Sequence, residues 1–147
     1  MLLKQISIFI ENSPGRLYEV TSALGEAGIN LRALSLVDKG DFGVLRLLVS
    51  DVANARRIMM EKQLPARVDD VVAAEIDDTP GSLARILKPL TTAHVNVLYM
   101  YAFVGFSTGR AVMIFHFSDN KKAIGILQKH GIRILDAVAF ALTEASA

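Results

Sequence analysis

The sequence has 147 residues, of which 52% are hydrophobic and 21% charged, and it contains only four prolines. This composition excludes a disordered chain and predicts a packed core. The formal net charge is +1 and no cationic stripe is visible, so we expect neither a nucleic-acid partner nor a membrane partner. The absence of cysteine excludes disulfides, thiolate metal sites and a cysteine nucleophile.

The chain shows no targeting or spanning segment. No apolar run approaches the roughly 18 uncharged residues that a transmembrane helix needs. The opening residues, MLLKQISIFI, lack the charged flank and cleavage site of a signal peptide, and they are typical of a strand. We therefore expect a cytoplasmic protein.

A strand and a helix open the chain. Residues 5–10 alternate and place three isoleucines on one face of a strand. Residues 12–15 predict a turn that starts a helix, with Ser13 as the cap and Pro14 at the first helical position. The apolar face of this helix consists of Leu17, Val20, Leu24 and Ala27. Gly28 is expected to end the helix in a left-handed conformation.

Two strands and a second helix follow. Residues 30–37 and 43–49 predict strands joined by a hairpin turn at 39–42. Ser50 and Asp51 start a helix. Its apolar face is Ala55, Ile58 and Met59.

The second half of the sequence repeats the first. Pro14-Gly15-Arg16-Leu17 aligns with Pro80-Gly81-Ser82-Leu83 at an offset of 66, and Asn30 aligns with Asn96. Gly43 and Gly109 keep this register, and two extra residues then bring Ser50-Asp51 opposite Ser118-Asp119. The chain is therefore interpreted as a duplication, with repeats at residues 1–69 and 70–147.

The second half predicts the same order of elements, which are a strand at 71–76, a helix from Gly81, strands at 96–104 and 110–117, a helix at 120–130 and a strand around 134–142. The order βαββαβ predicts an α+β protein of the ferredoxin-like sandwich class, duplicated. Two complete copies need eight strands, whereas about seven are visible. Residues 67–76 are therefore either a long strand shared by both copies, or the copies exchange terminal strands.

Two segments in each half resemble the ACT-domain signature. The first half has Asn12-Ser13-Pro14-Gly15-Arg16-Leu17 and then Ala27-Gly28-Ile29-Asn30-Leu31, and the second has Asp78-Thr79-Pro80-Gly81-Ser82-Leu83 and Ala93-His94-Val95-Asn96-Val97. The chain resembles a stand-alone tandem ACT protein. This resemblance implies a regulatory role, a free amino acid as ligand, and side-by-side pairing with the ligand at the interface beside the Pro-Gly turn. It also implies a regulated metabolic enzyme as partner. The small size of each unit and its exposed sheet edges predict a homodimer.

The residues themselves suit an amino acid. A helix that starts at Pro14-Gly15 leaves backbone N–H groups free to bind a carboxylate, and Gly15 allows close approach. Amide or carboxylate oxygens nearby can accept from the α-ammonium group. The candidate ligand-binding residues are Asn12, Ser13, Pro14, Gly15, Arg16, Leu17, Asn30 and Leu31 in the first repeat, and Asp78, Thr79, Pro80, Gly81, Ser82, Leu83, Asn96 and Val97 in the second.

Other interpretations remain open. The Pro-Gly turns are needed for the fold whether or not anything binds, and the alternative function is an interaction module that modulates a partner enzyme without a ligand. Tyr99, Tyr101 and Phe103 alternate on one strand and form a core, an interface or an apolar pocket.

We expect no catalytic residues, metal or cofactor. The three histidines His94, His116 and His130 share no metal-ligand spacing, and no triad can be placed. The adjacent Asp77 and Asp78 would point apart, which makes them poor acid–base partners.

Overall fold

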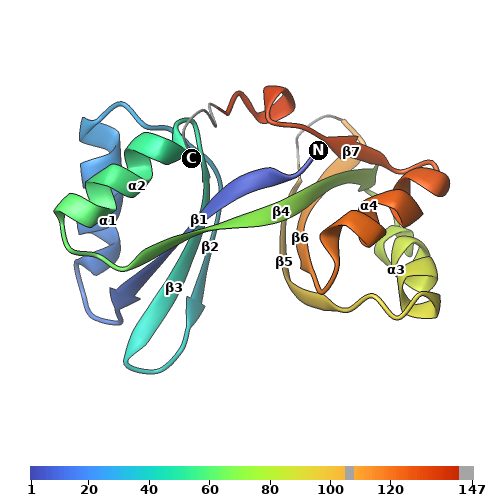
Figure 1. Cartoon of the computed structure of the whole chain (residues 1–147), viewed down its shortest axis with the longest axis horizontal. Helices are drawn as coiled ribbons and strands as arrows, with labels where there is room; N and C mark the ends of the chain where they lie inside the picture. The colour runs from blue at the N-terminus through green and yellow to red at the C-terminus, as the bar shows by residue number, and fades with distance from the viewer. Residues whose placement is uncertain (105–107, 143–147) are drawn as a thin grey trace. The chain divides into compact units, whose positions relative to one another are not determined.

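The computed structural model describes residues 1–104 and 108–142, which form two compact units. The first unit comprises Lys4–Asp69 together with the described residues after Asp136. The second unit comprises Met1–Leu3 and Asp70–Asp136. Each unit is a sheet with two helices (Figure 1).

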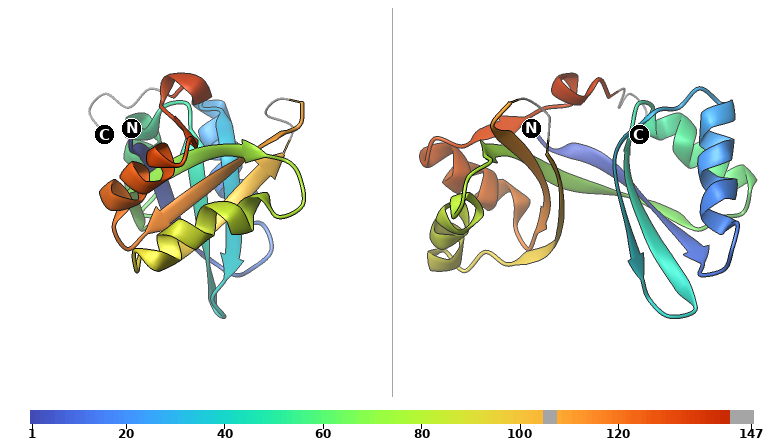
Figure 2. Two further views of the ribbon diagram at one scale, coloured as in Figure 1. Left: turned by 90° about the vertical axis from the view of Figure 1, so that its right-hand side faces the viewer. Right: turned by 180° about the vertical axis from the view of Figure 1, so that it is seen from behind.

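The first unit contains β1 (Leu3–Glu11), α1 (Arg16–Glu26), β2 (Leu31–Asp38), β3 (Phe42–Val49), α2 (Val52–Glu61) and the start of β4 (Ala66–Asp77). Its strand order is β2-β3-β1-β4, and β3 pairs antiparallel with both β1 and β2. Both helices lie against one face of this sheet (Figures 1 and 2). The core beneath them consists of Ile6, Ile8, Ile10, Val20, Leu24, Ile29, Leu45, Leu47, Val49, Val52, Ala55, Ile58 and Met59.

The second unit repeats this plan with the rest of β4, α3 (Ser82–Thr92), β5 (Val97–Val104), β6 (Arg110–Phe117), α4 (Asn120–Lys129) and β7 (Arg133–Leu135). Its strand order is β5-β6-β4-β7. The core consists of Val72, Ala74, Ile76, Ile86, Leu90, Val95, Ala111, Phe115, Phe117, Ala123, Leu127 and Ile134. The duplicated ferredoxin-like fold class is confirmed.

The seven-strand count is explained by β4. This strand is 12 residues long; its residues up to Asp69 belong to the first unit and those from Asp70 to the second. At the N-terminus, Leu3 is assigned to the second unit although β1 continues in the first. One long strand therefore serves both sheets.

The last strand is shorter than the sequence predicts. The expected strand around 134–142 is wrong beyond Leu135, because the chain turns there into a short 3₁₀ helix, Val138–Phe140. Phe140 is buried, and Ala141 adopts a left-handed backbone with φ of 52°. The 3₁₀ turn and the left-handed backbone of Ala141 are both incompatible with a continuing strand.

The two-residue insertion also lies elsewhere than predicted. The N–H of Asn12 donates to the carbonyl of Asp41 at 2.9 Å, and the N–H of Asp78 donates to that of Gly109 at 2.9 Å. Gly109 therefore takes the place of Asp41, not of Gly43. The extra residues precede Gly109, in the connection between β5 and β6.

Candidate ligand-binding site

The start of α1 differs from the expected cap. Gly15 is the capping residue, with φ of 90°, and among the described residues no side chain accepts a hydrogen bond there. The prediction that Ser13 caps the helix is wrong, because its backbone carbonyl, not its hydroxyl, faces the N–H of Arg16, at 3.4 Å. The free N–H groups and the helix dipole make this end electropositive, which favours an anion.

A cavity of about 210 Å³ opens beside this turn. It lies between the end of β1, the first turn of α1 and the β2–β3 hairpin, and is lined by Ile10, Glu11, Asn12, Ser13, Leu17, Leu36, Val37, Asp38 and Gly43. We call it the first-unit cavity. The amide nitrogen of Asn12 donates to the Asp38 carboxylate and to the Gly40 carbonyl, both at 3.1 Å. Asn12 therefore joins the turn to the hairpin and keeps the wall of the cavity in place.

The second unit has an equivalent cavity of about 330 Å³. It is lined by Ile76, Asp77, Asp78, Thr79, Gly81, Ser82, Leu83, Ala84, Ala111 and Met113, and we call it the second-unit cavity. Gly81 has φ of 83°, and again no side chain caps the helix among the described residues. The hydroxyls of Thr79 and Ser82 are 2.9 Å apart.

The charges at the two helix starts are arranged differently. In the first unit, Arg16 pairs with Glu19 at 3.0 Å and with Glu11 at 3.2 Å. The hydrogen bond to Glu19, followed by the charge of Glu11, raises the pKa of Arg16 above its ordinary value. In the second unit, Arg85 takes the position of Glu19 and donates to the Ser82 hydroxyl at 3.0 Å.

The structure brings together only part of the predicted site. Of the predicted residues, the first-unit cavity is lined by Asn12, Ser13 and Leu17, and the second-unit cavity by Asp78, Thr79, Gly81, Ser82 and Leu83. Pro14, Gly15, Arg16 and Pro80 belong to the same turns but do not line the cavities. Asn30 lies at the other end of α1, an 11-residue helix about 16 Å long, and its backbone exchanges hydrogen bonds with Ser50. Asn96 does the same with Ser118.

Leu31 and Val97 follow these asparagines as the first residues of β2 and β5. Leu31 therefore lies beside Asn30, and Val97 beside Asn96, at the end of each unit that is far from the Pro-Gly turn. A ligand at one turn of a unit therefore does not reach them within that unit.

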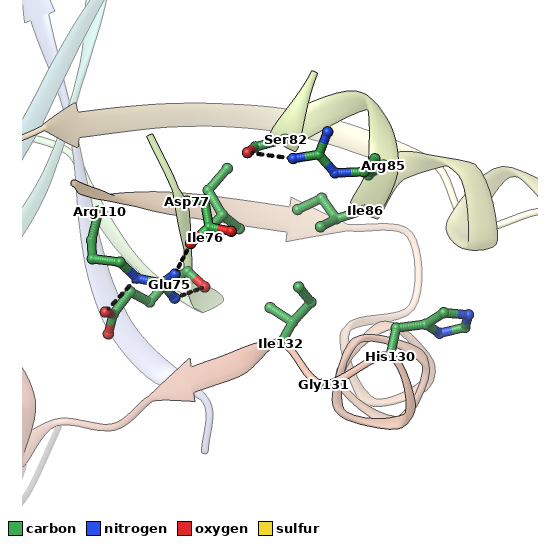
Figure 3. A pocket seen from close by; sticks show the side chains of 10 residues that line it. All are labelled: Glu75, Ile76, Asp77, Ser82, Arg85, Ile86, Arg110, His130, Gly131 and Ile132. Carbon is green, nitrogen blue, oxygen red and sulfur yellow. Dashed lines mark hydrogen bonds and ion pairs between the residues drawn. The ribbon is translucent and has the colours of Figure 1, made fainter. Parts of the chain in front are cut away.

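A larger cavity in the second unit is missed by sequence reasoning. It has a volume of about 420 Å³ and is lined by Glu75, Ile76, Asp77, Ser82, Arg85, Ile86, Arg110, His130, Gly131 and Ile132 (Figure 3). The side chains of Ile86 and Ile132 point toward its interior, whereas the His130 ring points outward (Figure 3).

Glu75 organises the charged wall of this cavity. Its carboxylate is buried and accepts from Arg110 at 3.0 Å and from Arg133 at 2.9 Å, and Arg110 also pairs with Asp77. The hydrogen bond to Glu75 raises the pKa of Arg110 above its ordinary value. A lone Glu in the apolar run VVAAEI is the sequence signal for such a network, because a buried carboxylate needs partners.

Tyr99, the first aromatic residue of β5, makes internal contacts. Tyr99 stacks on His116 with ring centroids 5.0 Å apart, and His116 Nδ1 lies 2.9 Å from the carbonyl of Asp70. The side chain of Phe103 lies outside the described residues. Within the described ranges there is no cluster of three potential metal ligands, and no helix suited to crossing a membrane.

These features define a tandem of ferredoxin-like units, each with a helix start that opens on a cavity. A family model described as "ACT domain pair" matches residues 1–142. The chain belongs to this family, as its two signatures indicate.

Several solved structures are similar to this chain. Protein BT0572 from Bacteroides thetaiotaomicron is 35% identical, with 96% of both chains covered and a TM-score of 0.90. The regulatory subunit of aspartate kinase from Thermus thermophilus is 15% identical, with 86% of this chain and 91% of that chain covered and a TM-score of 0.62. Aspartate kinase from Clostridium acetobutylicum is 17% identical, with 86% and 32% covered and a TM-score of 0.58. The two kinase similarities show a shared fold. A search of curated proteins finds no match.

Proposed function

We propose that this ACT domain pair is a regulatory protein that binds a free amino acid at the helix starts after its Pro-Gly turns. The observation that supports this most strongly is the repetition of one arrangement. In both units a left-handed glycine opens a helix without a side-chain cap, and that helix start borders a cavity. No catalytic step is part of the proposal.

The first-unit cavity offers groups for each part of an amino acid. The α-carboxylate would accept from the free N–H groups at the start of α1, close to the Cβ-free Gly15. The α-ammonium group would donate to acceptors such as Glu11 and Asp38, which line the same cavity. Ile10, Leu17 and Leu36 would contact the ligand side chain.

The size and exposure of the cavities favour a small, reversibly bound metabolite. Their volumes lie at or below the lower end of the roughly 300–1,000 Å³ typical of drug-sized ligands. We therefore expect dissociation constants between micromolar and millimolar, which correspond to about −8 to −4 kcal/mol.

The direct test is a thermal-shift screen of the twenty amino acids, followed by calorimetry. A ligand at 100 times its dissociation constant should stabilise the fold by about 2.7 kcal/mol. Gly15→Val should abolish binding, because a branched side chain beside the free N–H groups blocks the carboxylate. A folded Gly15→Val protein with unchanged affinity would place the ligand elsewhere, and no shift with any amino acid would remove the proposal.

Asn30→Ala separates two geometries for this site. Asn30 lies at the opposite end of α1 from the turn, so it affects affinity only if it reaches a ligand held by a different unit, of this chain or of a second copy, at a paired interface. In that case the loss of one hydrogen bond to a charged group should cost about 1.5–3 kcal/mol of binding. Unchanged affinity would confine the site to one unit. Asn96→Ala is the equivalent test in the second unit.

An interaction module is the second candidate function, and β2 supports it. This strand lies at the end of the first sheet, and its Leu34 and Leu36 are 56% and 49% exposed. Exposed leucines on an edge strand invite pairing with another chain, which supports a homodimer or contact with a regulated enzyme. Leu34→Lys should shift the mass measured by light scattering to that of a monomer. An unchanged mass would exclude this edge from the dimer.

A further inference from the structure

We infer that the outer surface of α3 and α4 in the second unit docks an acidic amphipathic segment of a partner protein. α3 and α4 lie side by side in this unit (Figures 1 and 2). A groove of about 520 Å³ runs along them. It is separate from the cavities at the Pro-Gly turns, and the inference does not depend on the proposed amino-acid ligand.

The rims of this groove carry positive charge from both helices. Arg85 and Lys88 line it from α3, and Lys129 lines it from α4. Lys122 lies at its end, where the Nζ donates to the carbonyl of Ala93 at 3.1 Å. All four side chains belong to exposed residues.

These cations are not neutralised by the helices that carry them. Neither α3 nor α4 contains an aspartate or glutamate, and among the described residues no carboxylate forms an ion pair with the four side chains. A surface of one charge sign attracts a partner of the opposite sign and raises its rate of association.

The first unit shows that this pattern is not imposed by the fold. Its helices carry Glu19, Glu26 and Glu61 among their basic residues, and Arg57 pairs with Glu61. The same helix layer is therefore mixed in charge in one unit and purely cationic in the other.

The floor of the groove is apolar, which favours a protein segment over a nucleic acid. Pro89, Ala93 and Ile126 line it between the charged rims. An amphipathic helix would place leucine-type side chains on this floor and carboxylates against the rims, as helices do in other hydrophobic grooves. Of the aromatic side chains, only the His130 ring is among the described residues that line the groove, so nucleotide bases would find no phenylalanine, tyrosine or tryptophan to stack on.

The test uses the full chain and a defined probe. A fluorescent peptide of about 16 residues, built from glutamate and leucine at helical spacing, is titrated with the protein at about 50 mM and about 300 mM salt. We expect saturable binding that weakens by about tenfold or more at the higher salt, because exposed charges are screened. A peptide of the same composition with scrambled leucines should bind at least about fivefold less tightly, because its apolar face is lost.

Two double variants locate the interaction. Lys88→Glu with Lys129→Glu should weaken binding by about tenfold or more, because both rims change sign. Arg56→Glu in α2 with Lys62→Glu at its C-cap makes the same change of net charge in the first unit and should leave affinity within about twofold. Circular dichroism melting confirms that both variants fold.

Four outcomes would overturn the inference. They are absence of binding, an equal loss in both double variants, equal binding of the scrambled peptide, and tighter binding of a DNA duplex with the same sensitivity to Lys88→Glu and Lys129→Glu. The last outcome would assign the surface to a nucleic acid instead.

Discussion

The two units carry different side chains at one equivalent pair of strand positions. In the first unit, β1 and β3 carry Phe9 and Phe42, whose rings are tilted at 52° with centroids 6.4 Å apart. In the second unit, β4 and β6 carry Glu75 and Arg110 at the same register, joined by a 3.0 Å ion pair. An aromatic contact and an ion pair thus fit the same backbone, so this position does not determine the fold.

What both units share is the set of residues that the backbone needs. Gly15 and Gly81 adopt positive φ at the helix starts, and Asp51 and Asp119 cap the second helix of each unit through N–H groups three residues on. The duplication therefore keeps turn and cap residues while polar side chains around the cavities vary. The residues that differ between the units are therefore the ones to test for a difference in function, because folding does not require them to be the same.

The largest expected effect tests whether the two cores are equivalent. Leu24 and Leu90 occupy equivalent helix positions and are 0% and 1% exposed. Leu24→Ala and Leu90→Ala should each cost about 2–5 kcal/mol, because each leaves a cavity in a packed core. Urea unfolding measures both.

Since β4 belongs to both sheets, we expect one transition in each of these two variants. Two separate transitions would show that the units unfold independently despite the shared strand.

A smaller effect is expected for the ion-pair network of the second unit. Glu75→Ala should cost about 1–3 kcal/mol, because Arg110 and Arg133 lose a buried acceptor but remain partly hydrated. Replacing the pair with the first unit's residues, Glu75→Phe with Arg110→Phe, should recover part of this loss, since an apolar pair can substitute for a buried ion pair. Chemical denaturation of both variants checks this. A double variant less stable than Glu75→Ala would contradict the equivalence of the two positions.

Much of the fold follows from local sequence patterns, whereas the charged network does not. The alternation of β1 and the turns that start the helices are readable because each depends on neighbours within a few residues, and the repeat is readable because the two halves keep their register in the sequence. The Glu75 network joins β4, β6 and β7, so it depends on strand register, which a single sequence does not fix.

The same limit explains the corrections. Whether Gly109 aligns with Gly43 or Asp41 is decided by the hydrogen bonds from Asn12 after β1 to Asp41 and from Asp78 after β4 to Gly109. The end of β7 at Leu135 is followed by the 3₁₀ helix Val138–Phe140, which the sequence pattern does not show. Of the candidate site, the sequence predicted the residues of each Pro-Gly turn, while the placement of Asn30 and Asn96 at the far ends required the structure.

The next effect concerns the two left-handed glycines, where substitution by alanine should lower the free energy of unfolding by about 1–2 kcal/mol. Gly15→Ala and Gly81→Ala should each be destabilising by that amount, because a residue with a Cβ is strained at positive φ. A Cβ at Gly15 would meet nothing within 4 Å, whereas one at Gly81 would lie 3.2 Å from Arg85. Gly81→Ala should therefore cost more. Thermal denaturation gives the order: equal costs would show that Arg85 moves freely, and a larger cost at Gly15 would contradict the expected order.

The smallest effect concerns the two aspartate caps and reports how far the units are coupled. Asp51 accepts from the N–H of Asn54 at 3.1 Å, and Asp119 accepts from that of Lys122 at 3.0 Å, so Asp51→Ala and Asp119→Ala should each cost about 1 kcal/mol. If the chain unfolds as one unit of this length, either loss should lower Tm by about 2–4 °C, whereas independent units of half the length would shift by about 4–8 °C.

Asp51→Asn and Asp119→Asn are matched controls, because asparagine caps about as well as aspartate and should leave Tm nearly unchanged. Calorimetry of the four variants measures these shifts. The two hydrogen bonds have nearly equal lengths, so the two alanine variants should lose equal stability. Unequal losses of Tm would show that the same local geometry stabilises the two units to different extents.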